Sequence, residues 1–146
     1  MNINVYTDGS CYPNPGPEGG WGCVVLAETL AIMLFGRIYG DAVTNNIAEL
    51  LGLINGMKAL PEGHNVNMVT DSLWSKNALE GTWNVTKNLG LVADGKNEMH
   101  RLGWKPRDKG DLKIRHIRGH RGNLYNEMAD DLAGRPWKSL PNMPTW

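Results

Sequence analysis

The chain has 146 residues, with 15 lysines and arginines against 15 aspartates and glutamates, so its formal net charge is zero. Such a length is typical of one domain with its own core, and a hydrophobic content of 41% with 21% charged residues excludes a disordered or collagen-like chain. The neutral balance argues against a protein that coats nucleic acid by bulk charge alone.

The charge is unevenly divided along the chain. Residues 1–75 carry two basic and seven acidic side chains, whereas residues 76–146 carry thirteen basic and eight acidic ones. This asymmetry can mark a site for a polyanion, or it can arise by chance. The two cysteines form no CxxC motif, so no zinc site is indicated. Without a signal peptide or an apolar run of about 18 residues, we expect a cytoplasmic protein with no membrane span.

The first half of the chain predicts three strands and a helix. Residues 3–7 alternate in polarity and indicate a strand that ends at Asp8. The segment 9–20 is rich in glycine and proline and predicts a long loop. Residues 21–27 and 31–39 read as two strands with a short link, which favours an antiparallel hairpin. A helix with helically spaced apolar residues follows, from a capping sequence at 44–46 to Met57.

The second half alternates strands and helices. The predicted elements are a strand over 66–70, a helix from Ser72 to about Leu79, a helix over 97–102, a strand over 112–117 and a helix over 124–133. Three meandering strands followed by helical crossovers give an α/β fold with a five-stranded mixed sheet, three strands antiparallel and then two parallel, flanked by helices. We expect one domain over residues 1–135 and an irregular tail rich in proline and tryptophan over 136–146.

Four carboxylates lie at or near the ends of these elements. Asp8 ends the first strand and Asp71 ends the fourth, so the two lie side by side if those strands are parallel neighbours. Glu49 lies about one turn into the first long helix, and Asp130 lies in the last helix. Both helical acids stand in otherwise apolar patterns, which is unusual for a solvated helix face.

Carboxylates that are brought together repel unless a cation neutralises them. Oxygen ligands alone favour Mg²⁺, with Mn²⁺ as a possible substitute. Two such ions roughly 3.5–4 Å apart are a common apparatus for phosphodiester cleavage, in which one activates water and the other stabilises the leaving oxygen.

Each acid also has a structural alternative. Asp8 could be a turn residue, and Asp71 could cap the helix that follows it. Glu49 could belong to a solvated helix face, and Asp130 could be a surface residue like its neighbour Asp131. The sequence therefore favours the catalytic interpretation only when the four acids are considered together.

Four segments, in order and with compatible spacing, resemble ribonuclease HI, the type 1 ribonuclease H family. They are TDGS with NPG over residues 7–16, TNNxxEL over 44–50, TDS over 70–72, and GHxG followed by NExxDxLA over 119–133. The resemblance covers about residues 3–134. It implies a ribonuclease H-like fold and an endonuclease that cuts the RNA strand of an RNA–DNA hybrid with divalent metal, leaving 5′-phosphate and 3′-hydroxyl ends.

The resemblance also implies roles for individual residues. The metal ligands correspond to Asp8, Glu49, Asp71 and Asp130, with the NExxDxLA pattern favouring Asp130 over its neighbour. The loop histidine of the family corresponds to His120, which can relay a proton near neutral pH; an exposed loop histidine is the alternative. Positions that touch the hybrid correspond to Asn14, Gly16, Thr44, Asn45, Asn46 and Trp83.

These substrate residues have structural alternatives too: helix capping for Asn45 and Asn46, and burial in the core for Trp83. The region 84–97 is short and holds only two lysines, whereas many bacterial relatives carry a long basic protrusion there, so the chain resembles a compact bacterial or phage member. We expect a monomer that binds an RNA–DNA hybrid through some of its late basic residues, with no membrane partner. A catalytically silent nucleic-acid-binding module of the same fold is the alternative.

Overall fold

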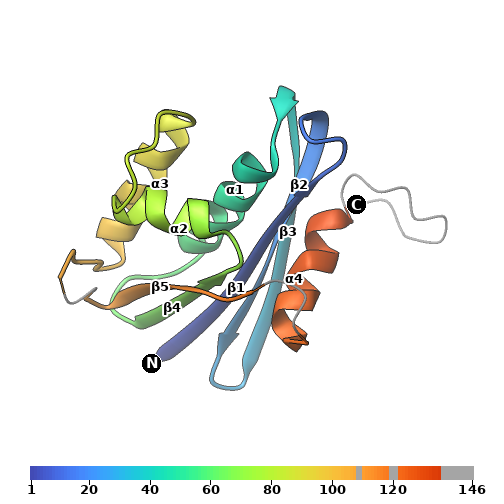
Figure 1. Cartoon of the computed structure of the whole chain (residues 1–146). Coiled ribbons are helices and arrows are strands. Elements are labelled where there is room, and N and C mark those ends of the chain that lie inside the picture. The colour runs from blue at the N-terminus through green and yellow to red at the C-terminus, as the bar shows by residue number, and fades with distance from the viewer. Residues whose placement is uncertain (108–109, 119–121, 136–146) are drawn as a thin grey trace.

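A computed structural model describes residues 1–107, 110–118 and 122–135, which form a five-stranded sheet with helices on both faces (Figure 1). In chain order the elements are β1 (Asn2–Cys11), β2 (Gly16–Ala27), β3 (Leu30–Val43), α1 (Asn45–Lys58), β4 (Asn65–Thr70), α2 (Leu73–Glu80), α3 (Leu89–Arg101), β5 (Leu112–His116) and α4 (Leu124–Gly134). None of the helices in these residues is long and apolar enough to cross a membrane.

The central strand of the sheet is β1, and the strand order is β3-β2-β1-β4-β5. Strands β1, β2 and β3 form an antiparallel meander, whereas β4 and β5 run parallel to β1. The predicted mixed sheet is therefore confirmed. In register, Thr7 of β1 lies beside Thr70 of β4, and Asp8 lies beside Gly22 of β2.

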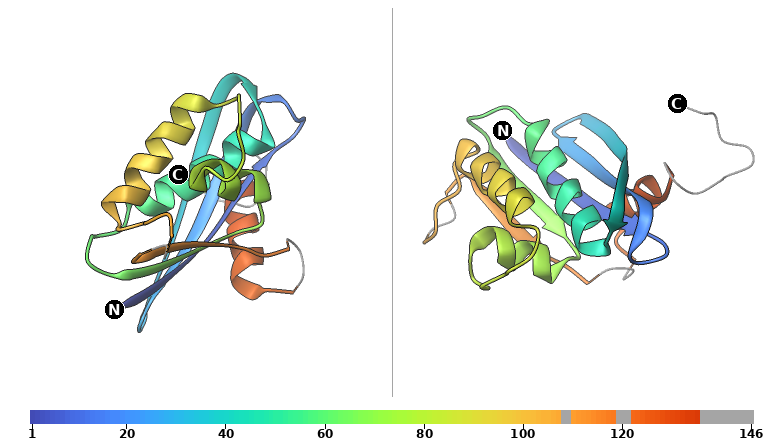
Figure 2. Two further views of the ribbon diagram at one scale, coloured as in Figure 1. Left: turned by 60° about the vertical axis from the view of Figure 1, so that its left-hand side comes forward. Right: turned by 90° about the horizontal axis from the view of Figure 1, so that it is seen from above.

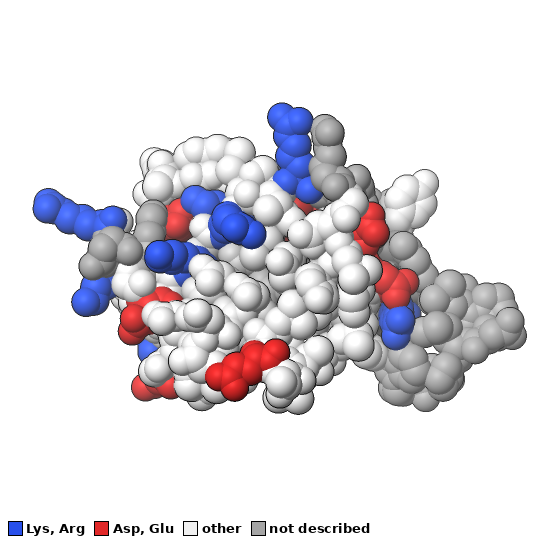
Figure 3. Space-filling view, turned by 90° about the horizontal axis from the view of Figure 1, so that it is seen from below, with Lys and Arg blue, Asp and Glu red and all other residues white. Residues whose placement is uncertain are grey.

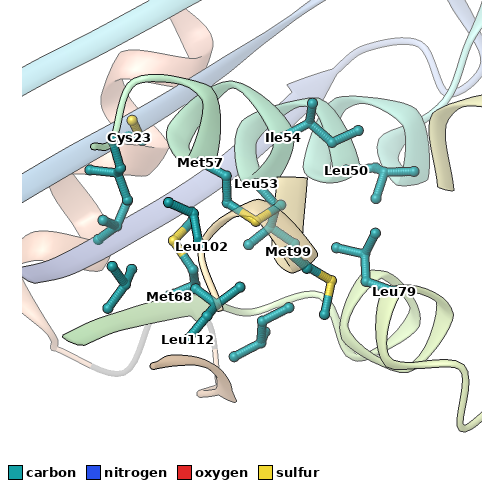
Figure 4. Close-up of a cluster of buried hydrophobic side chains, with 14 of the residues drawn as sticks. Cys23, Leu50, Leu53, Ile54, Met57, Met68, Leu79, Met99, Leu102 and Leu112 are labelled. Carbon is teal, nitrogen blue, oxygen red and sulfur yellow. The ribbon is translucent and has the colours of Figure 1, made fainter. Parts of the chain in front are cut away.

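Helices α1, α2 and α3 lie together on one face of the sheet, and α4 packs on the other face (Figure 2). The larger core lies between α1, α3 and the sheet, where Leu53, Met57 and Met68 are fully buried (Figure 4). A smaller cluster, which contains Val24 and Leu132, joins α4 to β2. Two cores on opposite faces hold β1 in the middle of the molecule.

The strands β1 and β2 are longer than predicted, because pairing across the sheet overrides local composition. Residues 9–11 and 16–20, expected in a loop, are strand residues: Cys11 pairs with Gly19 of β2, and Gly16 pairs with Val43 of β3. Helix α3 begins at Leu89, whereas the sequence predicted a helix only from residue 97. A Cβ on Gly95 would overlap Leu79 of α2, so this glycine, which weakens the helical signal, lets the two helices pack closely.

Arg101 fastens the end of α3 to the end of α1. Its guanidinium donates to the carbonyl oxygens of Met57 at 2.7 Å and Leu60 at 3.0 Å, and also to the Glu98 carboxylate at 2.7 Å. These carbonyls lie at or just beyond the C-terminus of α1, where carbonyl groups have no continuing helix to accept from. Arg101 is one of the basic residues in the second half of the chain, but its charge is engaged in holding the two helices together.

Candidate active site

Asp8 and Asp71 are brought side by side by the parallel pairing of β1 and β4. The last register pair of these strands is Thr7 with Thr70, and the two aspartates follow directly. Asp8 is only 2% exposed, and the backbone N–H of Gly9 donates to its Oδ1 at 2.8 Å. The expected meeting of these two carboxylates is therefore observed, but it lies where the β1–β4 pairing ends, because β1 itself continues past Asp8 to Cys11.

Glu49 reaches the two aspartates because α1 packs closely on β1. A Cβ on Gly9 would overlap the backbone of Ala48 and Glu49, so only glycine permits this approach. One carboxylate oxygen each from Asp8, Glu49 and Asp71 lies within 4.8 Å of the others. We call these three residues the acidic triad. Their mutual spacing suits oxygen ligands around a shared cation.

Asp130 approaches from the opposite face of the sheet. Its helix, α4, crosses β2 at Gly22, where a Cβ would lie 2.6 Å from the carbonyl oxygen of Ala129, and Gly22 is the register partner of Asp8. Asp130 is partly buried and its charge raises the pKa of Asp8. Asp131 instead points to solvent and pairs with Arg135 at 2.8 Å. Of the two neighbouring aspartates, Asp130 is thus the one whose charge acts on Asp8, but it is not among the carboxylates that lie within 4.8 Å of one another.

Burial and mutual repulsion disturb the ionisation of the triad. Burial is the largest cause that raises the pKa of Asp8 from 3.8 to about 7, and the charges of Asp71 and Asp130 add to it. Burial also holds the pKa of Glu49 well above its usual range, with the charge of Asp8 as the next cause. The buried Oε2 atom of Glu49 has no hydrogen-bond partner. A cation among these oxygens would compensate each of these unfavourable features.

The backbone around Asp71 is fixed by its neighbours. The hydroxyl of Thr70 accepts from the N–H of Ser72 at 3.1 Å, and Ser72 caps α2 by accepting from Ser75 N–H at 3.1 Å. The cap of α2 is therefore Ser72, and the alternative that Asp71 caps this helix is wrong. Its carboxylate lies in the triad.

His116 contacts the backbone of the site, although the sequence analysis gave it no functional role. Its Nε2 lies 3.2 Å from the carbonyl oxygen of Asp71, to which it can donate. The contact depends on the pairing of Thr70 with His116 between β4 and β5. Alternation along β5 indicates only which face the side chain occupies, so the sequence held no signal for this bond.

Three of the predicted substrate residues share an open pocket beside α1. Thr44, Asn46 and Trp83 line a cavity of about 520 Å³, together with Trp74 and Lys87. Trp83 is 46% exposed, so the alternative of a core tryptophan is wrong. An exposed ring, polar side chains and a lysine are the groups that contact bases and phosphates in nucleic-acid sites.

The other predicted substrate residues meet where the β1–β2 loop touches the start of α1. The backbone N–H of Asn45 donates to Oδ1 of Asn14 at 3.1 Å, and both side chains are exposed. The cap of α1 is Thr44, whose hydroxyl accepts from Ile47 N–H at 3.2 Å. Gly16 is buried close to Pro13, where a Cβ would lie 2.5 Å from the Pro13 carbonyl oxygen. The side chains of Asn45 and Asn46 are thus not used as caps.

Basic side chains stand close together on part of the face seen from below (Figure 3). Among the basic residues from position 96 on, those that are exposed and have no acidic partner within the described ranges are Lys96, Lys105, Arg107, Lys113, Arg115 and Arg118. His120, predicted as a proton relay, lies outside the residues that the structure describes, as does the tail over 136–146.

Comparison with known proteins decides the family. The RNase H family model matches residues 1–137. The chain belongs to the ribonuclease H family. Ribonuclease H of Wolbachia pipientis wMel is 35% identical, with 90% of this chain and 92% of the relative covered, and that of Cereibacter sphaeroides (strain ATCC 17029 / ATH 2.4.9) is 37% identical, with 90% and 92% covered. The chain is therefore an enzyme of the ribonuclease H type.

Solved structures of ribonucleases H have the same fold. RNase H1 from the halophilic archaeon Halobacterium salinarum NRC-1 superposes with a TM-score of 0.65 at 27% identity, covering 91% of this chain and 95% of that chain. LC11-RNase H1, solved in complex with an RNA/DNA hybrid, gives a TM-score of 0.66 at 25% identity, with 89% and 92% covered. The predicted ribonuclease H-like fold is confirmed.

Proposed function

We propose that the chain hydrolyses the RNA strand of RNA–DNA hybrids with two divalent cations, leaving 5′-phosphate and 3′-hydroxyl ends. The observation that carries this proposal is the acidic triad, whose carboxylates lie within 4.8 Å of one another. The family assignment supports it, as does a structural neighbour that was solved with an RNA/DNA hybrid. We further propose a cytoplasmic monomer with its catalytic domain over residues 1–135.

The residues of the site fit a hard divalent cation. Asp8, Glu49 and Asp71, with Asp130 from α4, offer oxygen ligands only, and the unpartnered Oε2 of Glu49 lacks a positive group to bind. We propose Mg²⁺, with Mn²⁺ as a substitute. When bound, such ions would supply Lewis-acid stabilisation of phosphate oxygens and would favour deprotonation of water.

The protein itself orients the substrate. Thr44, Asn46 and Trp83 would hold one strand in the pocket beside α1, while Asn14 and Asn45 would face the shallow minor groove with the 2′-hydroxyl groups that distinguish RNA from DNA. Glu49 follows Asn46 by about one helical turn, so the first turn of α1 connects the pocket to the acidic triad. His120 would relay a proton to or from water at the site.

Cleavage of an end-labelled RNA–DNA hybrid tests the proposal. We expect cutting within the RNA strand in Mg²⁺ or Mn²⁺, none in EDTA, and product ends that a ligase and a phosphatase can identify. Asp71→Asn should lower kcat by at least about a hundredfold, because it removes one charged ligand. Asp131→Asn is the matched control, since this exposed residue pairs only with Arg135 among the described residues, and it should cut like wild type. Equal cutting by wild type and Asp71→Asn would contradict the proposal.

The silent binding module is the second candidate, since a fold can be kept after catalysis is lost. It predicts hybrid binding without cutting and no heat of Mg²⁺ binding in a calorimetric titration. The raised pKa values in the triad argue against it, because an acidic cluster that binds no cation would only weaken the fold.

A further inference from the structure

The thiol of Cys11 lies among three oxygen atoms between two of the proposed substrate residues. Its Sγ is 3.2 Å from Oδ1 of Asn45, 3.4 Å from the carbonyl oxygen of Val43, and 3.7 Å from Oδ1 of Asn14. Cys11 is 7% exposed and ends β1. One sulfur atom therefore contacts the β1–β2 loop, the end of β3 and the start of α1.

The hydrogen-bond chemistry of this cluster fixes which way the amide groups face. The backbone N–H of Asn45 can only donate, so the atom of Asn14 that it contacts at 3.1 Å must be the oxygen. The thiol has a single proton to donate and meets only oxygen atoms. It remains protonated at neutral pH, because burial raises the pKa of Cys11. Both asparagine oxygens thus point inward, toward the sulfur.

We propose that Cys11 is a positioning residue, whose thiol holds the side-chain oxygen of Asn45 inward, beside the Asn14 oxygen that the Asn45 N–H holds, so that both NH₂ groups face the substrate as donors. The inference rests on the proposed function, because it concerns how these asparagines meet a hybrid. The minor groove offers mainly acceptors at its floor, the purine N3 and pyrimidine O2 atoms, and the 2′-hydroxyl of RNA also accepts. Two outward donors match that surface.

Packing alone does not require sulfur at this position. Cys11 also contacts a small apolar cluster formed by Ile38, Val43 and Ala48, and a valine would suit such a cluster in a strand. Valine has no proton to donate, whereas serine keeps a donor but fills less space. The pair Cys11→Val and Cys11→Ser therefore separates packing from hydrogen bonding.

The first test is steady-state cleavage of a hybrid by these two variants. Loss of the thiol contact should let the Asn45 amide rotate, so Cys11→Val should raise KM about three- to tenfold with kcat within about twofold of wild type. Cys11→Ser should stay close to wild type. Cys23→Ala is the control: this buried cysteine belongs to the main core, so it reports the effect of general destabilisation, and its KM should not change.

The second test shows whether Cys11 acts through Asn45. Asn45→Ala should raise KM by itself, and adding Cys11→Val to it should raise KM by clearly less than Cys11→Val does in wild type. The Kd of the same variants for hybrid is then measured by fluorescence anisotropy in Ca²⁺, so that binding is compared without cleavage. The inference is overturned if Cys11→Val and Cys11→Ser behave alike, or if Cys11→Val has its full effect beside Asn45→Ala. If wild type binds hybrid but does not cut it, the proposed function fails while the Kd comparison still decides the role of Cys11.

Discussion

Replacing Asp8 by asparagine should stabilise the metal-free protein at neutral pH. Asp8 is 2% exposed, and its pKa rises from 3.8 in the ordinary carboxyl to about 7 in the fold. At about 1.4 kcal/mol per pKa unit, ionising Asp8 costs the fold roughly 4 kcal/mol as an upper limit. Asparagine keeps an oxygen for the Gly9 N–H but carries no charge, so Asp8→Asn removes this cost.

The pH dependence follows from the same shift. Folded Asp8 holds its proton more tightly than unfolded Asp8, so the wild-type fold loses stability as the pH rises from about 4 to about 7. In EDTA at pH 8 we expect Asp8→Asn to raise the free energy of unfolding by about 2 to 4 kcal/mol, which raises Tm by roughly 5 to 15 °C. Near pH 4 the difference should vanish.

Thermal unfolding followed by circular dichroism measures this directly. Wild type, Asp8→Asn and the control Asp131→Asn are compared at pH 4, 6 and 8, in EDTA and in excess Mg²⁺. Mg²⁺ at ten times its Kd should stabilise wild type by about 1.4 kcal/mol and should help Asp8→Asn much less. A gain from Asp8→Asn that is equally large at pH 4, or no gain at pH 8, would refute the reasoning.

Three further predictions test how the site is built. Gly22→Ala should push α4 away from β2, which lowers the free energy of unfolding by about 1 to 3 kcal/mol and also lowers kcat. Urea unfolding measures the first effect and a cleavage assay the second. An unchanged kcat would show that Asp130 needs no such close packing. His116→Phe should lower kcat severalfold with little change in KM, because Asp71 loses its backbone support; a change confined to KM would contradict this. Lys87→Gln should weaken hybrid binding and reduce the slope of log Kd against log salt by about one, unlike Lys58→Gln, which breaks only a surface pair with Asp94.

The acids of the site could be predicted from the sequence because each breaks a local pattern. Asp8 interrupts the apolar alternation of β1, Asp71 directly follows the buried end of β4, and Glu49 interrupts an apolar helix face. Their partners could not be predicted, because each depends on register across the sheet or on helix packing. Gly22 lets α4 approach the site because it pairs with Asp8 and lies under that helix. His116 reaches Asp71 because it pairs with Thr70. The sequence therefore identifies residues that interrupt an apolar pattern, but not the residues that lie next to them in the folded chain.

The same reason explains where the predicted elements were too short. Glycines at 19 and 20 read as loop residues, but they are strand residues opposite Cys11 and Ser10. Gly95 weakened the signal of α3 and proved to be the point where that helix meets Leu79. In both regions the glycine serves a close approach between elements, which only the folded chain reveals.

Helix α1 carries both the pocket wall and one of the acids. Asn46 and Ile47 line the pocket, Glu49 joins the triad, and Arg101 ties the far end of the helix to α3. With a rise of about 1.5 Å per residue, only about 5 Å of rigid helix separates Asn46 from Glu49. A strand anchored at the pocket would therefore meet the acids at one constant offset. The first turn of α1 would then set the distance between the pocket and the bond that is cut.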